Sequence, residues 1–183
     1  MISIVIFQCL LVKFGNGLRF IISVLLGIDT EEFMMNPVLK SSSPSDFWGR
    51  RWNLIVHGVL KRGVYKPVRK HSSKLTAAIA VFLASGLFHE WVLAVIFYKI
   101  DNFPYCYGKN ILFFTWNGLI IVAEHIFGNA HVFQWINKTF PRVMVSLLVV
   151  LTALPIAHWF TGDYTESTFF QCVQLGFFIL KRI

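Results

Sequence analysis

Two ionisable residues, His89 and Glu90, stand side by side within an apolar run that extends from about Leu75 to Tyr98. The run has the roughly 20 residues that a helix needs to cross a bilayer. An ionised carboxylate at that depth costs about 2.5 kcal/mol or more, so acids and histidines within spans are candidates for function. His89 lies past the middle of the run, where a neutral imidazole can accept a proton from an alcohol as a general base.

A hydrogen bond between helices is the structural explanation for such a pair. Glu90 follows His89 by one position and points about 100° away around the helix, so we expect it to bond to a neighbouring helix or to be protonated itself. A second pair, Glu124-His125, lies near the end of another apolar run, where we expect solvation at headgroup level. A proton relay through both pairs, as in a proton-coupled transporter or channel component, is the alternative to an enzyme.

Several other chemistries lack their motifs in this sequence. Leu93 stands where a zinc protease of the His-Glu type would place its second histidine. The chain contains neither a glycine-rich phosphate loop nor a Gly-x-Ser-x-Gly turn around a nucleophilic serine. Cys9, Cys106 and Cys172 are too widely spaced for a metal-binding pattern or a disulfide framework. The sequence therefore predicts no metal site and no acyl-enzyme chemistry.

The 183-residue chain is more apolar than a soluble domain. Its residues are 56% hydrophobic and its mean hydropathy is +0.62, whereas soluble domains average roughly 45–50% apolar residues. We therefore predict an all-α, polytopic membrane bundle of about four to five transmembrane helices. The expected spans are an irregular one within residues 1–28 and regular ones at 75–98, 110–127, 143–160 and 167–180, with a kink at Pro155.

The formal charge of +8 comes largely from lysines and arginines in the short segments between the apolar runs. The most basic of these segments, 61–74, contains no acid. Because such segments stay on the cytosolic side of a membrane, we expect 61–74 to be a cytosolic loop. The positive-inside rule accounts for the net positive charge, so nucleic-acid binding is not needed to explain it. Anionic lipid headgroups, or an anionic cosubstrate such as acyl-CoA, could also use these basic residues.

Residues 46–60 have the pattern of an amphipathic helix that is too polar to cross a bilayer. Its polar face consists of Asp46, Arg50, Asn53 and His57. Its apolar face consists of Trp48, Trp52, Ile55, Val56 and Val59. We expect this helix to lie in the membrane interface, with its tryptophans at headgroup level, Asp46 paired with Arg50, and His57 in water.

Two motifs occur in order along the chain. The first is Asp46-Phe47-Trp48-Gly49-Arg50-Arg51-Trp52-Asn53, and the second, after the basic segment, is Ser85-Gly86-Leu87-Phe88-His89-Glu90. Their wording and order resemble the plant wax-synthase-like branch of the membrane-bound O-acyltransferase family. The resemblance implies an enzyme that moves a fatty acyl group from acyl-CoA to a lipid hydroxyl in the endoplasmic reticulum membrane. It also implies that His89 is the catalytic histidine and that Asn53 is the second polar residue of the active site.

The resemblance supplies further expectations about substrates. We expect the phosphates of acyl-CoA to lie near Arg50 and Arg51, with Trp48, Trp52 and Glu90 as further substrate-binding residues. Asn53 would donate a hydrogen bond to the thioester carbonyl. The acceptor would be a fatty alcohol or another lipid with a hydroxyl group, and no cofactor beyond the acyl-CoA cosubstrate is expected.

The resemblance covers the C-terminal half of the family, from about Ile21 of this chain onward. We therefore expect residues 1–183 to form a single membrane-embedded domain, with a partial version of the family's fold that lacks the N-terminal spans of longer relatives. An inactive or regulatory fragment that keeps this part of the fold is a further alternative.

Overall fold

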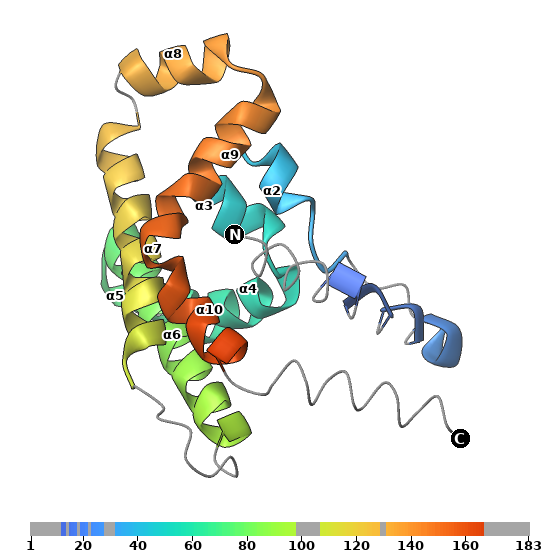
Figure 1. Cartoon of the computed structure of the whole chain (residues 1–183). Coiled ribbons are helices and arrows are strands. Elements are labelled where there is room, and N and C mark those ends of the chain that lie inside the picture. The colour runs from blue at the N-terminus through green and yellow to red at the C-terminus, as the bar shows by residue number, and fades with distance from the viewer. Residues whose placement is uncertain are drawn as a thin grey trace.

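The computed structural model describes residues 12–13, 15–17, 19–21, 23–27, 32–97, 107–128 and 131–166. Within these residues every regular element is a helix, which confirms the predicted all-α class (Figure 1). The predicted span at 167–180 lies outside the described residues, and the irregular span within 1–28 lies partly outside them. From residue 37 the elements are α2 (Pro37–Lys40), α3 (Pro44–Asp46), the π-helical η1 (Phe47–Arg51), α4 (Leu54–Leu60), the π-helical η2 (Lys61–Tyr65), α5 (Lys66–His71), α6 (Lys74–Phe97), α7 (Lys109–Phe127), α8 (His131–Thr139), α9 (Arg142–Ala153), the 3₁₀ turn η3 (Leu154–Ile156) and α10 (Ala157–Glu166).

Three described segments are long and apolar enough to cross a membrane, namely Lys74–Val95, Lys109–Phe127 and Arg142–Gly162. They coincide with the three middle spans predicted from the sequence. The third segment joins α9 to α10 through η3, a 3₁₀ turn that contains Pro155. Proline cannot donate the backbone hydrogen bond of a regular helix, and the α-helix is interrupted at the position where a kink was predicted.

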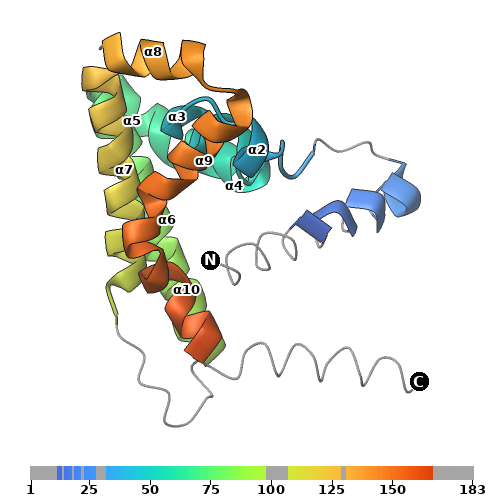
Figure 2. The ribbon, with the colours of Figure 1, turned by 45° about the horizontal axis from the view of Figure 1, so that its top comes forward.

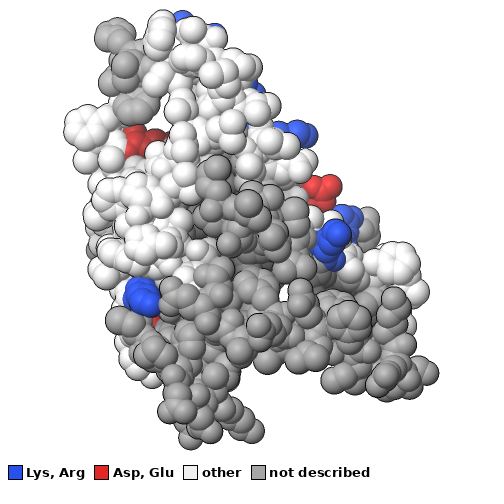
Figure 3. All heavy atoms as spheres, viewed as in Figure 1, with Lys and Arg blue, Asp and Glu red and all other residues white. Residues whose placement is uncertain are grey.

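The outer surface of these helices is apolar. Leu87 and Trp91 of α6 are 60% and 63% exposed, and Leu148 of α9 is 44% exposed. On the face seen in Figure 3 the described surface is largely uncharged, with a few charged side chains dispersed over it. Large apolar side chains are stable on a protein surface when lipid rather than water surrounds them. The apolar surface therefore indicates a membrane protein.

The two helices α6 and α7 run antiparallel in close contact (Figures 1 and 2). Gly86 allows this approach, because a Cβ atom there would lie 2.8 Å from Ile111 Cα. Nearer the start of α6, Phe82 packs against Gly118 of α7, where a Cβ atom would lie 3.1 Å from Phe82 Cβ. The start of α6 and the end of α7 therefore lie at the same end of the bundle.

The segment before α6 differs from the single amphipathic helix predicted over 46–60. The π-helical turn of η1 is followed by a break at Trp52 and Asn53, and α4 begins at Leu54. Asn53 adopts a left-handed backbone conformation, with φ 39° and ψ 70°, which asparagine tolerates better than most other residues. The predicted continuous helix is therefore wrong, and its predicted place in the membrane interface stays a prediction.

The carboxylate of Asp46 organises the turn that precedes this break. It accepts hydrogen bonds from the backbone N–H and the hydroxyl of Ser42, at 3.0 and 3.2 Å, and from Arg51 Nε at 2.8 Å. Arg51 rather than Arg50 is the partner, five residues after Asp46, in line with the i to i+5 hydrogen bonds of a π-helix, so the predicted pairing of Asp46 with Arg50 is wrong. Burial would raise the pKa of Asp46, but the hydrogen bonds and the Arg51 charge hold it below its usual value.

The basic segment 61–74 is helical over most of its length and is not the predicted loop. η2 continues directly from α4, and α5 continues from η2. Lysine and arginine are good helix formers, and Pro67 is tolerated in the first turn of α5. The cytosolic location of this segment stays a prediction.

Candidate active site

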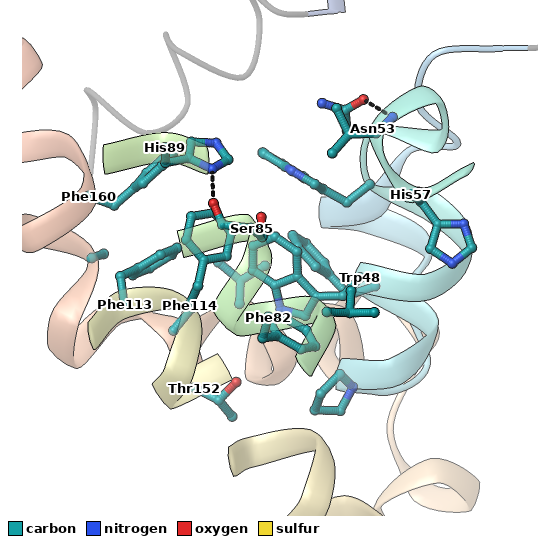
Figure 4. Close-up of a pocket in the computed structure, with 18 of the residues that line it drawn as sticks. Trp48, Asn53, His57, Phe82, Ser85, His89, Phe113, Phe114, Thr152 and Phe160 are labelled. Atoms are coloured by element: carbon teal, nitrogen blue, oxygen red, sulfur yellow. Dashed lines mark hydrogen bonds between the residues drawn. The ribbon is translucent and has the colours of Figure 1, made fainter. Parts of the chain in front are cut away.

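A cavity of about 330 Å³ lies between the segment 44–60 and the helices α6, α7, α9 and α10 (Figure 4). Most of its lining is apolar, with a small number of polar side chains, as is usual for sites that hold a largely apolar ligand. The aromatic residues of the lining are Phe47, Trp48, Trp52, Phe82, Phe88, Phe113, Phe114 and Phe160. The polar residues are Asn53, His57, Ser85, His89, Thr152 and Thr161.

His89 faces this cavity from α6 with a fixed ring orientation. Its Nδ1 lies 2.8 Å from the backbone carbonyl oxygen of Ser85, one turn earlier on the same helix. Because a carbonyl oxygen only accepts, Nδ1 carries the proton, and Nε2 of the neutral ring is left as an acceptor. The rings of Phe114 and Phe160 lie 4.5 and 5.4 Å from the imidazole, centroid to centroid, and restrict its rotation. The arrangement suits a general base.

Asn53 lies across the cavity from His89 (Figure 4). Its side-chain oxygen accepts a hydrogen bond from the backbone N–H of Val56 at 3.2 Å and caps the start of α4. This bond identifies the amide oxygen and leaves the NH₂ group with its donor hydrogens. The left-handed backbone at Asn53 interrupts the helix there. This interruption both makes Asn53 the cap of α4 and places its side chain in the cavity lining.

Trp48 lines the same cavity as part of a cluster of aromatic rings. Its indole ring lies within 6.4 Å of the rings of Trp52, Phe82, Phe113 and Phe114, centroid to centroid. All four of these contacts are edge-to-face, a favourable geometry for aromatic pairs. The sequence analysis predicted Trp48 and Trp52 as substrate-binding residues, and the structure places both in the cavity lining.

His57 also lines the cavity, although the sequence analysis placed it in water. It follows Asn53 by four residues, one turn of α4, and is half-buried. Burial and the nearby positive charge of Lys61 both lower its pKa, so the ring is neutral at pH 7. Its spacing from Asn53 was the available signal, but the sequence does not reveal that this face of the helix meets a cavity.

The two arginines of the first motif do not line the cavity. Arg50 is exposed, and Arg51 is bonded to Asp46 and to the backbone oxygen of Met35, at 2.8 and 3.2 Å. The second contact joins the motif to the chain that precedes α2. Arg51 therefore has a structural partner, and Arg50 is the arginine that remains accessible to an anionic ligand.

Glu90, expected among the substrate-binding residues, lies outside the cavity lining. Its side chain is buried, and Oε1 accepts hydrogen bonds from the backbone N–H groups of Gly108, Asn110 and Ile111, at 2.9, 2.8 and 3.4 Å. These groups belong to the first turn of α7, whose donors have no partner within the helix. The expected bond from Glu90 to a neighbouring helix is confirmed, and the expected substrate contact has no support from this geometry.

The second acid, Glu124, lies near the other end of α7 and binds Ser45 through both carboxylate oxygens. Between Asn110 and Glu124 the helix rises about 21 Å, at 1.5 Å per residue. Glu90 and Glu124 therefore lie far apart, at opposite ends of α7. Each accepts hydrogen bonds that include a backbone N–H donor. The aromatic cavity lies between these two ends of the helix. This arrangement does not favour the proton relay. Among the residues that the structure describes, no group of three or more His, Cys, Asp or Glu could hold a metal ion.

Comparisons with known proteins show which protein family this chain resembles. Residues 32–116, which include Asn53 and His89, match the model of the Membrane bound O-acyl transferase family. The predicted resemblance to the membrane-bound O-acyltransferases is confirmed, and the matched residues of this chain include both motifs. No solved structure is significantly similar.

Curated proteins of Arabidopsis thaliana are similar to this chain. Probable long-chain-alcohol O-fatty-acyltransferase 7 is 39% identical over 115 residues, which cover 58% of this chain and 32% of that protein. Probable long-chain-alcohol O-fatty-acyltransferase 3 is 31% identical over 174 residues, which cover 89% and 45%. Acyl-CoA–sterol O-acyltransferase 1 is 31% identical over 131 residues, which cover 67% and 36%. The chain thus spans less than half the length of these relatives.

Proposed function

We propose that this chain contains the acyl-transfer site of an acyl-CoA-dependent O-acyltransferase that esterifies a lipid hydroxyl. The observation that carries the proposal is that His89 and Asn53 face one apolar cavity, the first with an acceptor nitrogen and the second with a donor amide. The family match supports the same reaction class. An acyl chain fits the aromatic and aliphatic lining, which offers it few polar groups to desolvate.

The reaction that we propose needs one base and one hydrogen-bond donor. His89 Nε2 accepts the proton of the acceptor hydroxyl as its oxygen attacks the thioester carbonyl carbon. Asn53 donates a hydrogen bond to the carbonyl oxygen as negative charge develops there, and one such donor is typically worth about 3 kcal/mol. The carbon–sulfur bond then breaks, and the CoA sulfur takes the proton from His89. The products are the ester and CoA, and no covalent enzyme intermediate forms.

The substrates are proposed from the chemistry of the cavity together with the names of the relatives. A long-chain alcohol is the first candidate acceptor and a sterol the second, because relatives are named for these acceptors. The CoA phosphates would contact Arg50 and the cations of η2 and α5, since Arg51 is bonded to Asp46. We place the reaction in the endoplasmic reticulum membrane, where acyl-CoA and lipid alcohols meet.

The proposal is tested in membranes from a host that lacks neutral-lipid synthesis and expresses this chain. Radiolabelled acyl-CoA is supplied with a long-chain alcohol, a sterol or diacylglycerol, and the labelled esters are separated. We expect ester formation that His89→Ala lowers by at least about 100-fold, while His158→Ala, at an exposed position outside the cavity lining, leaves it unchanged. Undiminished transfer by His89→Ala at equal protein level would overturn the role of His89. Absence of ester with all three acceptors would overturn the proposed function.

A further inference from the structure

Glu124 belongs to an acid–imidazole pair that the proposed reaction does not use, yet it contacts the segment that carries the first motif. Its two carboxylate oxygens accept hydrogen bonds from the backbone N–H and the hydroxyl of Ser45, both at 2.7 Å. Ser45 lies in α3, whose N–H groups have no partner within the helix. Because α3 runs directly into η1, Glu124 holds the start of the segment that contains Trp48 and ends at Asn53.

Two glutamates attach α7 to its neighbours, one at each end. Glu90 of α6 binds backbone N–H groups at the start of α7, and Glu124 near the end of α7 binds Ser45. The middle of α7 supplies Phe114, whose ring lies 4.5 Å from that of His89 and 6.1 Å from that of Trp48. α7 therefore contacts both the helix that carries His89 and the start of the segment that carries Asn53.

We infer that Glu124 is a positioning residue for acyl transfer, which sets the place of the Asn53 amide relative to His89 by holding Ser45 against α7. This inference rests on the proposed function. A hydrogen-bond donor for the thioester oxygen must lie within a narrow range of positions, and a misplacement of about 1 Å can cost about 100-fold in rate. Glu124 itself touches neither the cavity nor the reacting atoms.

Three variants separate this role from proton transfer and from general stability. Glu124→Leu removes both acceptors at similar volume. Glu124→Gln keeps both bonds, because its oxygen accepts from the Ser45 N–H and its NH₂ donates to the Ser45 hydroxyl. His125→Ala, at the next and exposed position of α7, is the matched control.

We expect Glu124→Leu to lower kcat for labelled acyl transfer about tenfold, with KM for acyl-CoA within about twofold of the original value. We expect kcat to fall while KM changes little, because Asn53 acts on the developing oxyanion, whereas the cavity lining binds the acyl chain. Glu124→Gln should keep at least about half of kcat, and His125→Ala should match the unsubstituted protein. An unchanged kcat in Glu124→Leu would overturn the inference. So would an equal loss in Glu124→Gln, because glutamine keeps the bonds but cannot carry a proton.

A double-mutant cycle with Asn53→Ala tests whether Glu124 acts through Asn53. In that background Glu124→Leu should cost less than about twofold, because the amide that it positions is gone. The same tenfold loss in both backgrounds would indicate a general loss of structure and overturn the inference. These outcomes require that the unsubstituted protein transfers acyl groups in a His89-dependent way. If it does not, the proposed function fails, and this inference fails with it.

Discussion

At the scale of single residues, two polar side chains each use one atom for structure and keep another for chemistry. His89 Nδ1 is bonded to the Ser85 carbonyl, so Nε2 is the acceptor that faces the cavity. Asn53 Oδ1 is bonded to the Val56 N–H, so its NH₂ group is the donor. A base and an oxyanion donor in one apolar cavity are the groups that esterification of a lipid alcohol requires.

The substitution Asn53→Asp distinguishes the helix-capping role of the side-chain oxygen from the donor role of the NH₂ group. Aspartate tolerates the left-handed backbone and can accept the Val56 N–H, but it has no NH₂ group. We expect kcat/KM for acyl transfer to fall by about 100- to 1,000-fold, with the apparent unfolding temperature unchanged. Initial rates with labelled acyl-CoA and thermal unfolding of the purified protein provide the two measurements. Near-normal transfer by Asn53→Asp would show that the amide donor is dispensable.

Much of the candidate site could be predicted at this scale, because its residues are close together in two motifs. His89, Asn53, Trp48 and Trp52 were predicted and all line the cavity. His57 was missed because a helical projection placed it on a polar face, and the sequence does not show that this face lines a cavity. Motif membership also does not distinguish cavity residues from those that support them, as Glu90 shows.

At the scale of the elements, the break between η1 and α4 turns a predicted surface helix into one wall of the cavity. A π-helical turn holds one more residue than an α-helical turn, so it shifts every later side chain around the axis. Hydrophobic periodicity assumes a constant 3.6 residues per turn and cannot predict that shift. The pairing of Asp46 with Arg51 and the left-handed Asn53 are the local consequences.

Asp46→Asn should loosen this wall in a pH-dependent way. The pKa of Asp46 is held below its usual value of 3.8 by Arg51 and Ser42, so the stability from the charged form is complete above about pH 4 and is lost as the pH falls through the lower, folded-state pKa. We expect Asp46→Asn to reduce the free energy of unfolding by about 1–3 kcal/mol at pH 7, with the difference shrinking as the pH falls below about 4.

Chemical unfolding of the purified Asp46→Asn protein at a series of pH values measures this difference. Glu32→Gln, at an exposed carboxylate before α2, serves as the control and should unfold like the unsubstituted protein. Identical stability of Asp46→Asn and the unsubstituted protein at pH 7 would contradict the role assigned to the Asp46 carboxylate.

Gly86→Ala tests the contact between α6 and α7. The new Cβ atom would lie 2.8 Å from Ile111 Cα, in the backbone of α7, so the helices must separate. We expect a destabilisation of about 1–3 kcal/mol, measured by thermal unfolding in detergent. Gly63→Ala in η2, where no atom lies within 4 Å of the new Cβ, is the matched control and should not destabilise. Equal stability of the two variants would mean that α6 and α7 do not approach as described.

At the scale of the whole molecule, hydropathy and charge predicted the spans but not their packing. The three spans in the described part of the chain follow directly from length and composition. The antiparallel contact of α6 and α7 places the basic segment 61–74 at the same end of the bundle as the connection between α7 and α9, which carries Lys138. The positive-inside rule assigns both to the cytosolic side. The cavity between the helices could not be predicted, because it depends on which faces pack together.

Single cysteines test this topology in a background without Cys9, Cys106 and Cys172. Lys70→Cys and Lys138→Cys should react with a membrane-impermeant thiol reagent from the cytosolic side, because both lie in basic connections at the same end of the bundle. Tyr107→Cys, at an exposed position just before α7, should react only from the opposite side. Labelling of all three positions from one side would contradict the antiparallel pair of spans.

The central claim is that His89 and Asn53 act together on one transition state within this cavity. The most direct test is the initial rate of ester formation from labelled acyl-CoA and a long-chain alcohol. It compares the unsubstituted protein with His89→Ala, Asn53→Asp and the double variant at equal protein level. We expect the double variant to be no slower than His89→Ala alone, because the effects of residues that act as a unit are not additive. Ester formation by His89→Ala at the rate of the unsubstituted protein would contradict the central claim.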